Sequence, residues 1–265
     1  MTESIPDVQV RIEGGIAQLR LDRPELHNAF DDLLIAALIR ALDQLAADPS
    51  VRVIVLGGEG ASFSAGADLG WMRRMAAASE DDNRRDALEL ARLMRTLAYC
   101  PKPTIARVHG AAFGGGVGLI ACCDIAIAAE GVRLGLTEAR LGLVPAVISP
   151  YVIDAIGRRR ALRWFQTAEQ FDAAAALQAG LLHEVVPAAV LDEACARVCR
   201  SLLGNGPAAV AAAKQLVQRA GGRSLAAQLE IDQHNAALIA HLRVSAEGQE
   251  GLGAFLEKRK PGYAL

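Results

Sequence analysis

The stretch "HGAAFGGGVGLIACCDIAIAA", residues 109–129, decides how the rest of the chain is interpreted. It places four glycines within positions 114–118, between two apolar runs, and it holds few side chains capable of chemistry. Glycine lets a backbone approach a ligand closely, and the N–H groups at a helix start point outward without partners. The stretch therefore predicts a strand, a glycine loop and a helix whose first N–H groups can bind a negatively charged oxygen.

Glycine alone leaves two other interpretations open. The cluster is compatible with a tight strand-to-helix crossing that binds nothing. Gly116, Gly118 and Ala121 also match a relaxed dinucleotide-binding fingerprint, and Glu138 stands about 20 positions later, where an acid that binds a ribose is found. However, "LTEARLGLVP" around Glu138 is typical of a loop and a helical turn rather than a strand end, which disfavours a nucleotide-dependent oxidoreductase.

A second loop of small residues has the same setting. The run "VRVIVLGG" at 51–58 predicts a buried strand, and "FSAGADL" at 63–69 lies between this strand and a predicted helix. The loop can present a second outward N–H group. Two backbone N–H groups that converge on one carbonyl oxygen form an oxyanion hole. The two loops together therefore predict chemistry through an enolate or a tetrahedral adduct.

The order of predicted elements indicates an α/β fold. Residues 8–22 alternate polar and apolar side chains around Glu13-Gly14-Gly15, as in a hairpin, and 31–48 have helical periodicity. From about residue 149 onward the pattern is nearly all helical, and only "HEVVP" at 183–187 reads as a strand. We expect a core over residues 1–195, with the ligand site, and a helical C-terminal region over 196–265.

Composition excludes several functions. The 265 residues carry a formal net charge of −2, which gives no long-range field to attract nucleic acid. No apolar run reaches the roughly 18 residues of a membrane span. The five cysteines are an odd number without paired C-x-x-C spacing, and the first residues lack a secretory signal pattern. We therefore expect reduced thiols, a cytoplasmic location, and neither a nucleic-acid nor a membrane partner.

Seven motifs together resemble the crotonase, or enoyl-CoA hydratase/isomerase, superfamily. In chain order they are "RLDRPELHNAF", "FSAGADL", "PKPTIARVHGAAFGGGVGL", "CCDIAIAA", "LTEARLGLVP", "AAALQAGLLHEVVP" and "FLEKRKPGY". The resemblance implies a crotonase (ClpP-like) fold, with a superhelical core of repeated ββα units and a helical C-terminal region that drives trimerisation. It also implies an acyl-CoA thioester substrate and a homotrimer, or a hexamer built as a dimer of trimers.

The resemblance also assigns roles to particular residues. The two N–H donors to the thioester oxygen fall on Ala67 and Gly115, and the catalytic acid falls on Glu138. The implied substrate and coenzyme A contacts are Leu26, Ala65, Gly114, Gly118, Phe255 and Lys258. Coenzyme A enters as part of the substrate, so no separate cofactor and no metal is expected.

Departures from the family pattern bear on the reaction. Hydratases of the family typically carry a first glutamate two residues after the triple glycine, where this chain has Gly118, so only Glu138 remains. The segments "SAGADLGWMRRM" and "PAVISPY" resemble bacterial hydratases of methylglutaconyl-CoA or isohexenylglutaconyl-CoA, in leucine and acyclic-terpene breakdown. For such substrates Arg73, Arg74 or Arg140 could pair with the distal carboxylate.

Three functions therefore stay open. The leading one is an enoyl-CoA hydratase acting on a branched or carboxylated enoyl-CoA through an enolate. The second is a Δ3,Δ2-enoyl-CoA isomerase, because such isomerases keep only the second glutamate and one carboxyl group can move a proton between two carbons. The third is a non-catalytic homologue that binds coenzyme A, which the retained Glu138 disfavours.

Overall fold

Two sheets form the centre of the molecule. The computed structural model describes residues 2–265 and contains a seven-stranded sheet, ordered β1-β2-β3-β4-β6-β8-β11, and a four-stranded sheet, ordered β10-β9-β7-β5. The strands are β1 Thr2–Ile5, β2 Val8–Glu13, β3 Ile16–Leu21, β4 Val53–Gly58, β5 Ser62–Ser64, β6 Thr104–Val108, β7 Ala111–Phe113, β8 Ile125–Ala129, β9 Arg133–Gly135, β10 Gln170–Asp172 and β11 Glu184–Val186.

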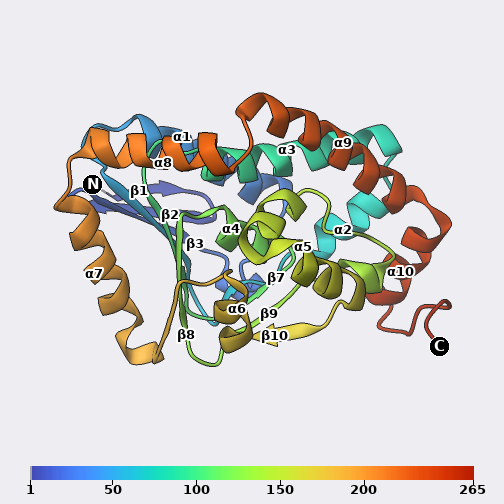
Figure 1. Ribbon diagram of the computed structural model, residues 1–265. Helices are drawn as coiled ribbons and strands as arrows, with labels where there is room; N and C mark the ends of the chain where they lie inside the picture. The colour runs from blue at the N-terminus through green and yellow to red at the C-terminus, as the bar shows by residue number, and fades with distance from the viewer. Residues whose placement is uncertain (1) are drawn as a thin grey trace.

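Helices cover the sheets and make up most of the C-terminal part (Figure 1). The α-helices are α1 Asp32–Ala47, α2 Leu69–Ala76, α3 Glu80–Ala98, α4 Gly115–Cys122, α5 Ser149–Thr167, α6 Ala173–Ala179, α7 Leu191–Leu203, α8 Pro207–Gly221, α9 Leu225–Val244 and α10 Ala246–Leu256. Short 3-10 helices are η1 Pro24–Leu26, η2 Glu138–Leu141 and η3 Ala188–Val190. The α/β class expected from the sequence is confirmed.

The large sheet follows from its sequence pattern. β2 and β3 pair as the predicted antiparallel hairpin, while β3, β4, β6 and β8 run parallel. All six residues of β4 are buried, as expected for a parallel strand covered on both faces. The side chains of Asp31 and Ser79 accept backbone N–H groups at the starts of α1 and α3. α3 packs between α1 and α9, along the upper side of the sheet in Figure 1.

The small sheet was not predicted from the sequence. Its strands have three residues each, too few for an alternating pattern to stand out. β5 lies inside the loop expected after β4, and β7 separates β6 from the glycine cluster. β10 is a second strand in the part expected to be helical apart from 183–187. α4 begins at Gly115, inside the glycine cluster.

The C-terminal part is mostly helical, and no loop separates it from the core at the expected boundary. Residues 195 and 196 both lie inside α7. The division into a core of 1–195 and a C-terminal region of 196–265 stays a prediction. α5 is interrupted at Gly157, whose φ of +75° lies outside the helical region. None of the helices in residues 2–265 combines the length and hydropathy required to cross a membrane.

Gly110, which joins the two sheets between β6 and β7, should not tolerate a side chain. A Cβ atom there would lie 2.3 Å from the carbonyl oxygen of Ala61 and 2.9 Å from Cα of Ser62. Gly110→Ala should lower the free energy of unfolding by about 1–3 kcal/mol, because backbone must shift to make room. Gly221→Ala is the matched control, since a Cβ at Gly221 meets nothing within 4 Å. Equal denaturation midpoints for the two variants would contradict this account.

Candidate active site

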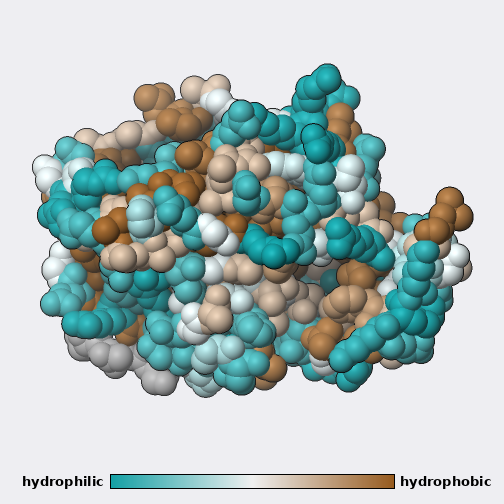
Figure 2. Space-filling model, turned by 90° about the horizontal axis from the view of Figure 1, so that it is seen from below, coloured by the Kyte–Doolittle hydropathy of each residue, from teal (hydrophilic) through white to brown (hydrophobic). Residues whose placement is uncertain are grey.

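A cavity of about 420 Å³ lies where the ends of β5 and β7 meet α2, α3, η2, α9 and α10. Its walls are mainly apolar, and they include Met72, Leu90, Ile239 and Leu252. In Figure 2 apolar residues gather beside the C-terminal segment, on the side where Figure 1 shows α10. Such a largely apolar cavity with a few polar groups is the usual form of a small-molecule site.

The first candidate oxyanion donor is the N–H group of Ala67, in the loop after β5. Hydrogen bonds from Phe30 N to Gly66 O (2.6 Å) and from Asp68 N to Phe30 O (2.8 Å) hold the peptide on both sides. Neither bond uses the Ala67 N–H group, which has no acceptor among residues 2–265. Since Ala67 lines the cavity, this donor is available to a ligand.

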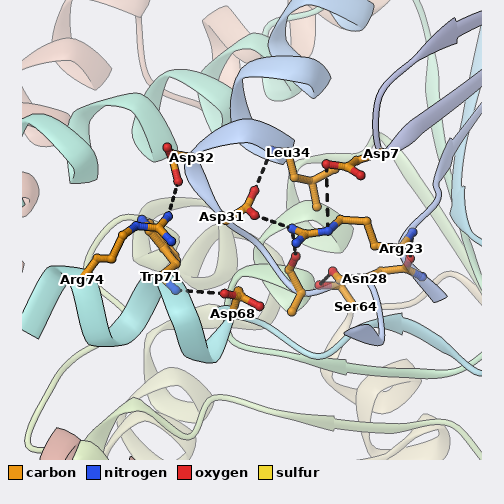
Figure 3. Close-up of polar contacts among 11 residues, drawn as sticks. Asp7, Arg23, Asn28, Asp31, Asp32, Leu34, Ser64, Asp68, Trp71 and Arg74 are labelled. Carbon is orange, nitrogen blue, oxygen red and sulfur yellow. Dashed lines mark hydrogen bonds and ion pairs between the residues drawn. The ribbon is translucent and has the colours of Figure 1, made fainter. Parts of the chain in front are cut away.

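Buried polar side chains fix the segment that carries Phe30 (Figure 3). Arg23 pairs with Asp31 at 2.8 Å and also donates to the carbonyl oxygen of Ala29. Asn28 is fully buried; it accepts a hydrogen bond from Arg23 N, and its carbonyl oxygen accepts one from the Ser64 hydroxyl at 2.8 Å. These bonds join residues 23–31 to β5, so the Ala67 peptide is held before any ligand arrives.

The second candidate donor is the N–H group of Gly115, the first residue of α4. The first N–H groups of an α-helix have no carbonyl group within the helix to accept them, and no side chain among residues 2–265 caps α4. Gly114 has a φ of +49°, a left-handed conformation that glycine adopts without cost, and it turns the chain from β7 into the helix. The two loops touch, because a Cβ on Gly66 would lie 3.0 Å from the carbonyl oxygen of Phe113.

Glu138 begins η2, and its carboxyl group faces the glycine loop. A Cβ on Gly114 would lie only 3.1 Å from Oε1 of Glu138, so a side chain there would crowd the carboxyl group. Oε2 is buried and has no hydrogen-bond partner among residues 2–265. Burial raises the pKa of Glu138 to about 7, because an apolar surrounding disfavours the charged form. A carboxyl group with this pKa can both accept and donate a proton near neutral pH.

The structure brings most of the sequence-predicted residues to one cavity. Those that line it are Ala65, Ala67, Gly114, Gly115, Glu138 and Phe255. Leu26, Gly118 and Lys258 do not line it. Leu26 is exposed on η1, next to His27, whose carbonyl oxygen accepts the Ala65 N–H group at 2.9 Å. Lys258 is exposed just beyond α10.

Gly118 is separated from the cavity by Ile148. A Cβ on Gly118 would lie 2.3 Å from Cγ2 of Ile148, and Ile148 itself lines the cavity. The place where a longer side chain at 118 would extend is therefore filled by an aliphatic group. A glutamate at 118 would need Ile148 to move.

Of the three arginines named from the sequence, one lines the cavity. Arg74 pairs with Asp32 at 2.5 Å on the surface, and Arg73 does not line the cavity. Arg140 lines the cavity and is exposed to solvent. Arg243 of α9 also lines the cavity and was missed from the sequence, because an arginine in the last turn of a helix is typical of a dipole partner.

The five cysteines are unpaired and buried. Burial raises the pKa of Cys122 and Cys123, which keeps both as neutral thiols. Within residues 2–265, no three His, Cys, Asp or Glu side chains are grouped so that they could hold a metal ion. That the reaction needs no metal and no separate cofactor stays a prediction.

Comparisons with known proteins agree with this geometry. The family model described as enoyl-CoA hydratase/isomerase matches residues 11–264. The chain is 36% identical to a hydroxycinnamoyl-CoA hydratase-lyase of Pseudomonas fluorescens, covering 96% of the chain and 94% of the relative. It is 33% identical to the 2,3-dehydroadipyl-CoA hydratase of Escherichia coli, covering 99% of both.

A solved structure shares the same fold over nearly the whole chain. It is an enoyl-CoA hydratase from Shewanella pealeana, with a TM-score of 0.79, 45% sequence identity, and coverage of 97% of this chain and 96% of the other. Over nearly all of its length, the chain therefore belongs to the enoyl-CoA hydratase/isomerase family of the crotonase superfamily, and it is an enzyme of that family.

Proposed function

We propose that the protein adds water across the conjugated double bond of a branched or carboxylated enoyl-CoA, of the methylglutaconyl-CoA type. One observation carries the proposal: the carboxyl group of Glu138 shares an apolar cavity with the free N–H groups of Ala67 and Gly115. The name of the E. coli relative supports a carboxylated acyl group, because an adipyl chain ends in a second carboxylate.

A single carboxylate suffices for both proton transfers. The oxygen of water adds to C3 of the enoyl thioester while ionised Glu138 takes one of its protons. The C2–C3 π electrons move onto the thioester oxygen, and the resulting enolate is stabilised by the N–H groups of Ala67 and Gly115. Protonated Glu138 then gives the proton to C2, the thioester carbonyl re-forms, and the carboxylate is regenerated.

The remaining contacts are assigned to the coenzyme A part of the substrate. Ala65 and Gly114 line the cavity beside the two donors, and Phe255 lines it from α10 while 48% exposed. Leu26 and Lys258 are exposed outside it, where a nucleotide portion of the thioester can reach them. Gly118 has no direct contact in this proposal, because Ile148 covers it.

The isomerase remains a second candidate because of Gly118 and Ile148. With an aliphatic side chain filling the place of a first glutamate, Glu138 is the one carboxyl group among the residues that line the cavity. One carboxylate can remove a proton from C2 of a 3-enoyl-CoA and return it to C4. Absorbance of the conjugated thioester separates the two reactions: hydration of methylglutaconyl-CoA lowers it, whereas isomerisation of a 3-enoyl-CoA raises it.

Glu138→Gln should lower kcat by about 10²–10⁴-fold, the usual contribution of general acid–base catalysis, because glutamine cannot accept the proton. Binding of a saturated thioester such as butyryl-CoA should stay nearly unchanged. Glu130→Gln is the matched control, since Glu130 is exposed at the end of β8. Retained turnover in Glu138→Gln would remove this residue from the mechanism.

The pH dependence of the unmodified enzyme tests the same group. Because burial raises the pKa of Glu138 to about 7 and the reaction starts from the carboxylate, kcat/KM should fall below about pH 7. The fall should approach tenfold per pH unit, as for one protonation of the free enzyme. A profile that is flat from pH 5 to 8 would show that Glu138 is ionised throughout, against the proposed burial effect.

We also propose that the protein forms a trimer through its C-terminal helices, or a hexamer of two trimers. α8 has no buried residue, and Leu216 and Val217 on it are 66% and 70% exposed. Leu229 and Leu238 of α9 are exposed as well. Exposed apolar side chains of this kind favour association with another chain. The unpaired, buried cysteines support a reducing, cytoplasmic compartment for this assembly.

Leu216→Glu combined with Val217→Glu should reduce the molecular mass seen by light scattering to that of one chain of 27.9 kDa. The charges would be buried without partners in the interface. Arg219→Glu, at the exposed end of the same helix, provides a control for added charge. A double variant with the same mass as the unmodified protein would contradict an interface on this face.

A further inference from the structure

Arg243 is a charged residue on an otherwise apolar wall of the cavity. It stands in the last turn of α9, and its side chain is only 14% exposed. Its guanidinium group lies 5.6 Å from the centre of the Trp71 ring, which also lines the cavity. Burying a guanidinium group is costly unless it is paired and hydrogen-bonded. Its presence on this wall therefore requires an explanation.

One acidic and one amide side chain of α3 hold the guanidinium group in one orientation. Nη1 of Arg243 donates to Oδ2 of Asp86 at 3.0 Å and to Oδ1 of Asn83 at 3.2 Å. The other carboxylate oxygen of Asp86 accepts the indole N–H of Trp71 at 2.8 Å. Trp71 thus fixes Asp86, and Asp86 fixes Arg243.

The other edge of the guanidinium group is free. Both hydrogen bonds come from Nη1, whereas Nη2 and Nε have no acceptor among residues 2–265. A planar guanidinium group with one edge anchored can offer two parallel N–H groups on its other edge, which match a carboxylate. A hydrocarbon chain at this place would leave those donors without an acceptor.

The position of Arg243 suits the far end of a short acyl chain. Trp71 and Met72 line the same cavity as Ala67, and the Arg243 guanidinium group lies over the Trp71 ring. A thioester bound at the Ala67 N–H group can therefore place its acyl chain against Trp71 and Met72. Its terminal group would then be close to the guanidinium group.

We propose that Arg243 determines substrate specificity by binding the distal carboxylate of the acyl group. This inference rests on the proposed function, because it assumes that the thioester is held at Ala67 and Gly115. Asp86 and Trp71 act as positioning residues, since they orient Arg243. The expected substrates are thioesters of dicarboxylic acids whose second carboxylate lies a few bonds beyond the reacting carbons.

Binding of two saturated thioesters tests the inference without relying on turnover. Glutaryl-CoA carries a distal carboxylate, and butyryl-CoA does not. Calorimetry should show that the unmodified protein binds glutaryl-CoA about 10- to 100-fold more tightly, as expected for a charged hydrogen bond. No preference in the unmodified protein would overturn the inference, whatever the variants do.

Variants then assign the preference to a residue. Arg243→Met combined with Asp86→Asn avoids leaving a buried carboxylate unpaired, and it should abolish the preference while keeping butyryl-CoA affinity within about threefold. Arg243→Lys, which keeps the charge but not the planar fork, should retain part of the preference. Arg140→Met is the matched control, because Arg140 lines the same cavity. Loss of the preference in Arg140→Met instead would overturn the role of Arg243.

The two proposals can fail separately. If the protein prefers glutaryl-CoA through Arg243 but neither hydrates methylglutaconyl-CoA nor isomerises a 3-enoyl-CoA, the proposed reaction is wrong and the inference stands. If it hydrates methylglutaconyl-CoA and crotonyl-CoA, and the Arg243 variants lower both rates equally, the inference is wrong and the reaction stands.

Discussion

The parallel pairing of β5 with β7 is the constraint on which the rest of the site depends. Each strand leads into one of the segments that carry Ala67 and Gly115, so two N–H groups that are far apart in the sequence line one cavity. The hydrogen bonds among Arg23, Asn28 and Ser64 join residues 23–28 to β5 and so fix the position of the first loop. Donors held in this way need no reorganisation when charge develops on a substrate oxygen.

The apolar cavity has a second effect, on the acid rather than on the donors. The carboxyl group of Glu138 has its Oε2 buried without a partner, and this burial brings its pKa close to neutrality. With Ile148 covering Gly118, an aliphatic side chain fills the place where a longer side chain at 118 would extend. The absence of a charged neighbour there leaves desolvation as the main influence on the pKa of Glu138.

Much of the fold followed from the sequence because its signals are local. The hairpin of β2 and β3, the periodicity of α1 and α3, and the glycine loop before α4 all depend on neighbouring residues. The three-residue strands could not be found in this way, since their pairing with distant segments stabilises them. Arg243 was missed for a similar reason: its place on the cavity wall results from the packing of α9 against α3, which no local pattern records.

The closure of the cavity by α10 affects the order in which the site can form. Leu252 and Phe255 line the cavity, Gly251 packs against Leu141 of η2, and the Tyr263 hydroxyl donates to the carbonyl oxygen of Arg140. Ribosomes make a chain from its N-terminus, so the two loops and Glu138 are synthesised well before α10. A nascent chain therefore has the oxyanion donors and the acid before it has a complete cavity, whose wall beside η2 forms only when the last helix docks.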